Sequence, residues 1–599
     1  MILSPLDITI IALYLLASLG AGVWFSRRGT RDIQAFFVSG RSLPWWLAGA
    51  TMIASAFAID TPIGITAMVA DHGIPGVWYA WSFMLGGAGM LGAFIFSALL
   101  RRSGVISAAE IAELRYSGRS AALLRGFKGV YFGILANAIT LGWIIRAVWV
   151  IAEQAVPDVN RGLVLAVILV VTLGYTAASG LWGIAATDCI QFVIGSAGSL
   201  MLAWFALRET GGIALLVEGL TQRYGATEAA ARLRFFPQMG TPFFVTFIVF
   251  LTLKWWGNPP PAIMQRILAS RDEQHASKAT FFFAVIAFGF NYWPMILAAL
   301  ASLVLYPTLS ASELRSGIGY ARLVVDILPS GFLGLMLASM LAAFMSTVDT
   351  HINYGASFMI NDLYRRFLVR NASASHYVRA SQCATVLMLG IAVGIACHME
   401  SVAAAWLFMS MLTAGYGIVA TVRWFWWRVN AWSEIATLTA SLCTSLLFHR
   451  PLARALGYEH LVTTIPWGYR FLITTLIVTL VWVLVTLITP PCPMATLEAF
   501  CRRVRPFRLG WGALQHHVSD IPWSDGLGVA IARWATGSAA VMTFCFGTGS
   551  LFLARFTQGA LLMGTTAVLW WTLFRVLGTQ TLCPAGSTQQ HEPLQENRQ

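Results

Sequence analysis

Charged side chains are scarce in this sequence of 599 residues. Only 11% of the residues are Asp, Glu, Lys or Arg, whereas 57% are hydrophobic. Soluble domains carry about a quarter charged residues, so the composition excludes an ordinary soluble globule. Apolar stretches of about 18 or more residues recur along the chain, and each is long enough for a transmembrane helix. Because a helix satisfies its own backbone in lipid, the sequence predicts an all-α protein that crosses the membrane many times.

Motifs for enzymatic chemistry are also missing. The eight cysteines form no CxxC pair, so we interpret them as small core residues rather than disulfides or metal ligands. The chain has no GxxxxGK[ST] segment, and its apolar stretches hold no nucleophile–base pair. These features predict a protein that is not an enzyme and that needs no cofactor.

Fifteen spans fit the apolar pattern best. They lie at about 5–26, 44–69, 75–99, 127–152, 161–179, 183–207, 240–257, 278–306, 330–355, 376–397, 402–424, 431–448, 468–489, 535–554 and 557–574. The first span has its basic residues after it, as expected for an uncleaved anchor rather than a signal peptide.

The formal charge of +13 could suggest a nucleic-acid partner. Lys and Arg concentrate, however, in loops on one side of the predicted membrane, as at Arg101–Arg102 and Arg365–Arg366. By the positive-inside rule that side is cytoplasmic, which puts the N-terminus outside and the C-terminus in the cytoplasm. We therefore expect a multi-pass protein of the cell (inner) membrane, in contact with lipid and not with nucleic acid. The oligomeric state stays open, with a monomer among the alternatives.

Two of the spans carry residues that interrupt helices. Span 44–69 contains Asp60-Thr61-Pro62, and span 240–257 contains Lys254 and leads into Gly257-Asn258-Pro259-Pro260-Pro261. Proline lacks the N–H that continues a helix, so both helices should break or kink. They lie five spans apart, as paired broken helices do in transporters built from inverted repeats. Since Pro and Gly are common in membrane helices, two unrelated kinks are the alternative.

A polar stripe interrupts the apolar segment 337–367. Ser346, Asp349, Thr350 and Asn353 recur at helical spacing, with Thr347 beside them. Hydroxyl and carbonyl oxygens are hard ligands that suit an alkali cation better than amines or sulfur do. Ser and Thr also bond to carbonyls of their own helix or join helices. The spacing leaves both interpretations open.

Four separated segments resemble the sodium:solute symporter family. They are SGRSLPWWLAGATMIASAFAIDTPIGITAMVADHG, YTAASGLWGIAATDCIQFVIG, IMQRILASRDEQHASKATFF and LASMLAAFMSTVDTHINYGASFMINDLYRRF. The resemblance runs in order from about Leu6 to Trp427. It implies the leucine-transporter fold, a 5+5 inverted repeat of core helices, with one extra N-terminal and about four extra C-terminal helices.

The resemblance also implies a division of the chain. The parts are 1–43 (extra span and basic loop), 44–207 (repeat 1, core helices 1–5), 208–239 (outer loop), 240–430 (repeat 2, core helices 6–10), 431–577 (accessory spans with a cytoplasmic loop, 490–534) and 578–599 (polar tail).

A sodium site between the first and eighth core helices follows from the same resemblance. Its implied ligands are the carbonyls of Ala54, Phe57 and Ala343 and the side-chain oxygens of Ser346 and Thr347. Asp188 matches the family's acidic residue near the inner end of the fifth core helix, with an implied role in sodium exit or in an accessory site. Asp349, one turn below the Ser-Thr pair, either shares that role or pairs with a neighbouring helix. Na⁺ is the coupling ion and the only metal implied.

The substrate region is implied at the helix breaks. Its candidate residues are Ala56, Ala58, Asp60, Thr61, Tyr79, Phe83, Arg146, Lys254, Trp255 and Trp256. Three of these are intramembrane charges, which should face a cavity or a partner because an unpaired charge in lipid is costly. In one hypothesis, Lys254 or Arg146 binds a carboxylate of the substrate, and Asp60 binds an ammonium or hydroxyl group of it. The alternatives are an Asp60–Lys254 ion pair and an Arg146 that extends to the membrane surface.

Together these features predict a sodium-coupled secondary active transporter, a symporter that imports a small organic solute by alternating access. A proton-coupled symporter, with Asp188 or Asp60 as the proton carrier, is one alternative. A transporter-like membrane sensor of a solute is the other.

Overall fold

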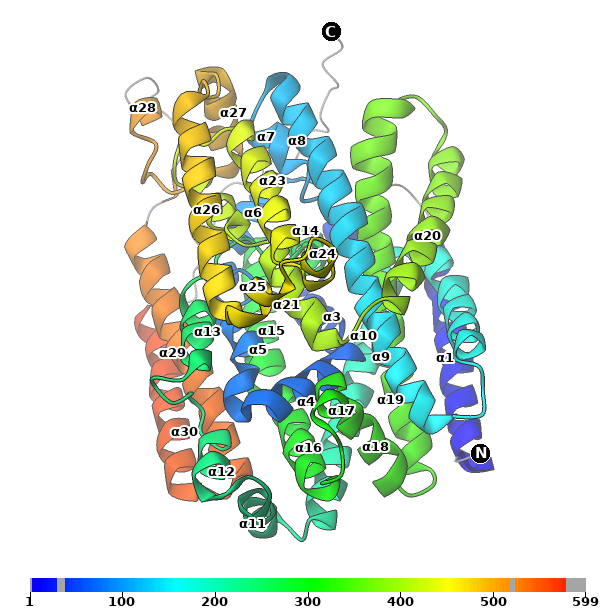
Figure 1. Cartoon of the computed structure of the whole chain (residues 1–599). Helices are drawn as coiled ribbons and strands as arrows, with labels where there is room; N and C mark the ends of the chain where they lie inside the picture. The colour runs from blue at the N-terminus through cyan, green and yellow to red at the C-terminus, as the bar shows by residue number, and fades with distance from the viewer. Residues whose placement is uncertain (1–2, 30–37, 516–522, 525, 578–599) are drawn as a thin grey trace.

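A computed structural model describes residues 3–29, 38–515, 523–524 and 526–577 (Figure 1). Helices make up most of this part of the chain, and its residues form no strand beyond two isolated bridges. Among them, eight helices are long and apolar enough to cross a membrane, or up to ten if two bent pairs each count as one span. The all-α polytopic fold is therefore confirmed, whereas the count of fifteen spans stays a prediction. The predicted polar tail, 578–599, lies outside the described residues.

The first half of the chain forms a run of helices that includes several short, irregular pieces. They are α1 (Pro5–Gly29), η1 (Ser39–Arg41), α3 (Trp45–Ala56), α4 (Asp60–His72), η2 (Ile74–Val77), α5 (Trp78–Trp81), η3 (Ser82–Met84), η4 (Gly92–Phe96), α6 (Ser97–Ser103), α7 (Ile111–Arg115), α8 (Gly118–Val130), η5 (Tyr131–Ala136), α9 (Asn137–Ala155), α10 (Arg161–Glu209), α11 (Ile213–Tyr224) and α12 (Ala226–Arg232). The 49 helical residues of α10 would extend about 74 Å if straight, which is long enough for both spans predicted in this range.

The second half continues the pattern and adds the accessory helices. Its elements are α13 (Pro242–Thr252), α14 (Pro261–Ala269), α15 (Glu273–Ile286), η6 (Ala287–Asn291), α16 (Tyr292–Leu305), α17 (Ala311–Ser316), α18 (Ile318–Ile327), α19 (Phe332–Ala356), η7 (Ser357–Leu368), α20 (Ala374–Cys397), α21 (Val402–Leu412), α22 (Tyr416–Val422), α23 (Ala431–Leu447), α24 (Arg450–Ala455), α25 (Glu459–Thr464), α26 (Trp467–Ile488), α27 (Met494–Val504), α28 (Gly512–Gln515), α29 (Leu527–Phe552), α30 (Phe556–Trp571) and η8 (Thr572–Val576).

Both predicted helix breaks are present. The axes of α3 and α4 differ by 55° across the break at 57–59, and α13 ends eight residues before α14 begins. Pro62 and Pro261 sit in the first turn of the helix that follows each break, where the missing N–H needs no partner, and Pro259 and Pro260 lie just before α14. A third break, between α21 and α22, bends by 46° and was not predicted.

Accessory helices flank the core on opposite sides in Figure 1. The blue α1 packs against α10 and α19 on the right, and the orange-red pair α29 and α30 stands on the left. The short helices α11, α12 and α17 lie at the end that also holds the N-terminus, whereas α7 and α27 lie at the other end. Helix α1 and the α29–α30 pair therefore stand on opposite sides of the molecule.

Candidate functional site

The polar stripe predicted on 337–367 lies on one buried face of α19. Ser346, Thr347, Asp349, Thr350 and Asn353 are all almost fully buried. The Ser346 hydroxyl donates to Oδ1 of Asp188 at 2.6 Å, and the Thr347 hydroxyl donates to the carbonyl of Ala343 at 2.8 Å. One hydroxyl thus joins two helices while its neighbour bonds back to its own helix.

Asp188 is the centre of a buried network that joins four elements. Its Oδ2 accepts a hydrogen bond from the Thr51 hydroxyl on α3 and lies 3.6 Å from Nη2 of Arg266 on α14. Arg266 in turn donates to the Thr350 hydroxyl at 2.6 Å. All these side chains are at most 1% exposed. A carboxylate and a guanidinium therefore compensate each other beside the Ser-Thr pair, where either charge alone would be costly.

The five predicted sodium ligands belong to two helices that pack together, α3 and α19. Ala54 lies in the last turn of α3, and Phe57 caps that helix. The last carbonyls of a helix have no partner within it, so they are free to accept from a ligand. Ala343, Ser346 and Thr347 share a face of α19. The structure thus brings the proposed ligands onto adjacent elements with the oxygen chemistry that an alkali cation needs.

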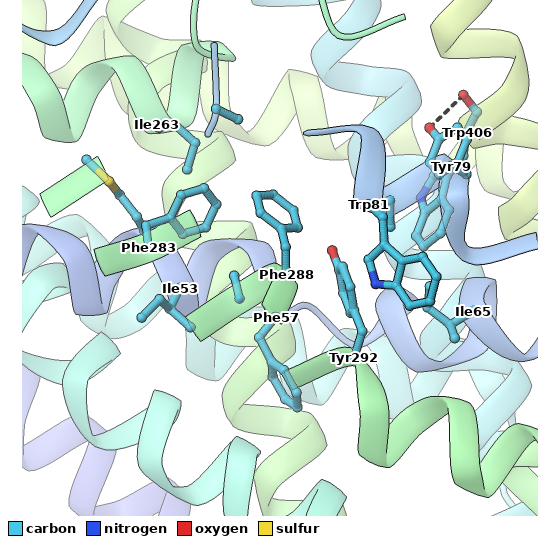
Figure 2. Close-up of a cluster of buried hydrophobic side chains, with 14 of the residues drawn as sticks. Ile53, Phe57, Ile65, Tyr79, Trp81, Ile263, Phe283, Phe288, Tyr292 and Trp406 are labelled. Atoms are coloured by element: carbon cyan, nitrogen blue, oxygen red, sulfur yellow. Dashed lines mark hydrogen bonds between the residues drawn. The ribbon is translucent and has the colours of Figure 1, made fainter. Parts of the chain in front are cut away.

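A second polar group surrounds the break between α3 and α4. Asp60 is the first residue of α4 and is 5% exposed. Its Oδ2 accepts from Nε1 of Trp406 at 3.1 Å. Tyr79 donates from its hydroxyl to the Trp406 carbonyl at 3.0 Å, and the two rings stack with centroids 5.4 Å apart (Figure 2). Trp406 on α21 therefore holds both Asp60 and Tyr79.

Lys254 lies in the break after α13 and does not pair with Asp60. Its Nζ donates to the carbonyl of Tyr79 at 2.7 Å and lies 3.7 Å from the ring centroids of both Tyr79 and Phe83. Of the two alternatives for these charges, the Asp60–Lys254 ion pair is wrong: the structure describes both side chains and joins them by no ion pair. Tyr79 and Trp406 stand between them.

The remaining predicted substrate residues are spread over the same region. Thr61 donates to the carbonyl of Ala56 across the break at 3.1 Å. Trp255 and Trp256 stack on each other at 4.5 Å, with Trp255 buried and Trp256 38% exposed. Arg146 lies on α9, and the described residues give it no hydrogen bond to Asp60, Tyr79 or Lys254. The structure therefore groups Lys254 and Tyr79 but gives no contact between Arg146 and this group.

Sequence reasoning missed Arg266, Thr51 and Trp406. Arg266 falls in the motif IMQR, which the fifteen-span assignment put in a loop, so it was not counted with Asp60, Arg146 and Lys254 among the intramembrane charges. A sequence signal was present, because Arg266 stands within the mainly apolar segment PAIMQRILA that forms α14. The structure buries it completely. Trp406 and Thr51 carried no such signal, since one Trp or Thr in an apolar helix is ordinary.

Two helices broken near their centres, with buried polar groups around the breaks, define the class of protein. This is the architecture of a secondary transporter, in which unwound helices form sites in the middle of the membrane.

The sodium:solute symporter family profile matches residues 36–438, and the chain belongs to that family. The sodium/mannose cotransporter SLC5A10 of Bos taurus is 25% identical over 490 residues, which cover 74% of this chain and 78% of the relative. Sodium/glucose cotransporter 1 of Oryctolagus cuniculus is 25% identical over 468 residues, covering 71% and 69%.

A solved structure of a Na⁺-coupled sialic acid symporter aligns with a TM-score of 0.64 at 18% identity, over 82% of this chain and 99% of that chain. At this identity the likeness shows the fold, which is the predicted leucine-transporter type. The family membership shows a multi-pass sodium-coupled solute transporter that is not an enzyme, with Na⁺ as coupling ion and no cofactor. The count of helices in each repeat stays a prediction.

Proposed function

We propose that this protein is a symporter that uses inward sodium flow to import a small organic solute across the cell (inner) membrane by alternating access. The observation that carries the proposal is the buried Ser346–Thr347 pair on α19, a helix that packs against α3, with the Ser346 hydroxyl bonded to Asp188. Sodium between the two helices would hold them together and favour one of the alternating states, which couples ion binding to solute binding.

The proposed sodium ligands are the carbonyls of Ala54, Phe57 and Ala343 and the hydroxyls of Ser346 and Thr347. Both hydroxyls point their protons away, toward Asp188 and toward the Ala343 carbonyl. A hydroxyl that donates elsewhere keeps its lone pairs for a cation. Asp188 would receive the ion as it leaves, and Asp349, buried on the same helix, would serve the same path.

The proposed orientation has the N-terminus outside and the C-terminus in the cytoplasm. Arg101 and Arg102 end α6, and Arg502 and Arg503 end α27. Helix α27 lies at the end of the molecule opposite the N-terminus (Figure 1). Basic groups at that end fit a cytoplasmic face.

The proposed solute site lies at the breaks, around Asp60, Tyr79, Trp406 and Lys254. The wall of this site would be completed by Ala56, Thr61, Phe83, Trp255 and Trp256. Arg146 on α9 would contact the solute only if the solute or a helix movement brought the two together. Trp406 and Tyr79 stack across this region, so their separation is the motion that would admit a solute.

Thermal unfolding of the purified full chain tests the sodium site. A ligand that binds only the folded protein stabilises it by RT ln(1 + [L]/Kd), so Tm should rise with NaCl more than with KCl or choline chloride. Ser346→Ala and Thr347→Ala should weaken this sodium-specific rise. Thr475→Ala is the matched control, because Thr475 is a buried threonine on α26 that bonds to a carbonyl of its own helix. A Tm independent of sodium but dependent on pH would favour proton coupling and contradict the proposal.

A further inference from the structure

Lys254 is a partly buried cation, and among the described residues its ammonium contacts a carbonyl and the rings of Tyr79, Phe83 and Phe250. One N–H of its ammonium donates to Tyr79 O, and the faces of Tyr79 and Phe83 flank the group. Cation–π contacts offset part of the cost of burying an ammonium, but such a group usually pairs with a carboxylate when it lies inside a membrane. The sequence suggests Asp60 as a carboxylate partner of Lys254, but in the structure Asp60 accepts a hydrogen bond from Trp406.

A cavity of about 70 Å³ opens beside this ammonium. Lys254 and Trp256 line it from the break after α13, Ser410 lines it from α21, and Thr413 and Gly415 line it from the break between α21 and α22. The described residues that line it include one cation, two hydroxyl groups and no carboxylate. The cavity therefore carries a positive charge from Lys254. Its two hydroxyl groups donate to carbonyls of α21 and would have to rotate to donate to an anion.

Beside the cavity, the break after α13 and the first turn of α22 meet backbone to backbone. A Cβ on Gly417 would lie 1.8 Å from the carbonyl oxygen of Trp256, and a Cβ on Gly257 would lie 2.9 Å from the Cα of Gly417. No side chain fits between these two segments at this contact. The site thus belongs to two broken helices at once and would change shape whenever either of them moves.

The volume limits what can enter. Pockets that hold a whole drug-sized ligand measure about 300–1,000 Å³, so this cavity accommodates one functional group rather than a whole solute. The rest of the solute would extend past Phe83 toward Tyr79 and Trp406.

We infer that the transported solute carries a small anionic group, of carboxylate type, that enters this cavity and pairs with Lys254. The inference rests on the proposed function and specifies its substrate class. A carboxylate would complete the hydrogen bonds of the ammonium with a charge-assisted bond, which a hydroxyl or an amide does only weakly. A free halide ion would supply the same negative charge without belonging to the solute, so the test distinguishes a halide from a carboxylate.

The test measures Tm of the purified full chain at constant sodium and ionic strength. The probes are the sodium salts of acetate, propionate, lactate and pyruvate, with acetamide, propionamide and lactamide as uncharged analogues. Sodium chloride is compared with the sodium salt of a bulky organic sulfonate to expose any effect of halide. At least one carboxylate should raise Tm where its amide does not, with an affinity about tenfold or more weaker in Lys254→Met.

Two further variants keep the result interpretable. Lys254→Arg retains the charge and should retain part of the carboxylate effect, whereas Lys278→Met makes the same change at an exposed lysine and should behave as wild type. A sodium-dependent rise of Tm in Lys254→Met shows that the variant folds and that the sodium site is intact.

Three outcomes overturn the inference without touching the proposed function, provided that sodium still stabilises the protein. They are equal effects of carboxylate and amide, a carboxylate effect that survives in Lys254→Met, and no effect of any probe. A Lys254-dependent effect of chloride alone would assign the cavity to a free halide and overturn the claim about the solute.

Discussion

Arg266 on α14 and Asp188 on α10 form an ion pair enclosed on every side, with 3.6 Å between Nη2 and Oδ2 and no exposed surface on either side chain. The pair joins the two halves of the chain next to the proposed sodium ligands. Each charge is stabilised by the other, because neither side chain is exposed to water.

Removing one charge of this pair should be far more costly than breaking a surface pair. Arg266→Gln leaves the Asp188 carboxylate buried without its cation, and we expect a loss of about 3–5 kcal/mol in the free energy of unfolding. The measurement is SDS-driven unfolding in mixed micelles. Arg315→Gln is the control, since Arg315 pairs with Asp71 at the surface, where the side chains are 62% and 38% exposed, and should lose about 0–1 kcal/mol. Similar losses in the two variants would contradict the enclosed pair.

The double variant Asp188→Asn/Arg266→Gln refines this prediction. With both charges gone, no lone ion remains buried, so part of the stability lost in Arg266→Gln should return. A double variant that is less stable than the single one would show that the two residues act through other contacts.

The contact between Gly64 and Trp406 should be intolerant of a single methyl group. A Cβ at Gly64 would lie 2.4 Å from the Trp406 ring, so Gly64→Ala should displace the indole from Asp60 and destabilise the protein by about 1–3 kcal/mol. Unfolding in mixed micelles measures the loss, and Trp fluorescence should report the displaced ring. Gly390→Ala on α20 has open space around it and should be neutral or slightly stabilising, because alanine favours helices. A neutral Gly64→Ala would contradict the packing.

Arg115 should hold the segment from α27 to α28 onto the core. Its guanidinium donates to the carbonyls of Arg423, Trp426 and Trp427 and lies over the rings of Phe500 and Trp511 at 5.4 and 4.9 Å. Arg115→Met removes the cation–π contacts with Phe500 and Trp511 as well as the hydrogen bonds, so trypsin should cleave more quickly at the arginines that follow Phe500, by about tenfold or more if the segment opens locally. The exposed Arg119 supplies the control, Arg119→Met, with unchanged cleavage. Equal rates in both variants would show that Arg115 does not retain the segment.

Trp534 should stabilise the irregular stretch after α5 from outside the core. Its indole on α29 donates to the carbonyl of Leu85 at 2.8 Å and packs on Trp255. Trp534→Phe keeps a ring but leaves that carbonyl without its donor, at an expected loss of about 1–3 kcal/mol. Trp571→Phe, at a position 61% exposed on α30, should cost less than about 0.5 kcal/mol. Chemical unfolding measures the loss of stability in both variants. Equally small losses would show that α29 lies beside this stretch without stabilising it.

The sequence by itself determined where helices run and where they stop. Apolar stretches in lipid must be helical, and proline disfavours a helix interior, so the breaks before Asp60 and Pro261 followed from residue types alone. The spacing of Ser346, Thr350 and Asn353 likewise fixed one polar face of α19, because helical periodicity is local.

Only the tertiary structure decided what those groups face. Asp188 meets Thr51, Ser346 and Arg266 across as many as 158 residues of chain, and Lys254 bonds to Tyr79 rather than to Asp60. The third break, between α21 and α22, carries no proline and is recognised from the 46° bend between the two helices. Partner choice among buried charges depends on which helices pack together, and that is a property of the whole fold rather than of any local pattern.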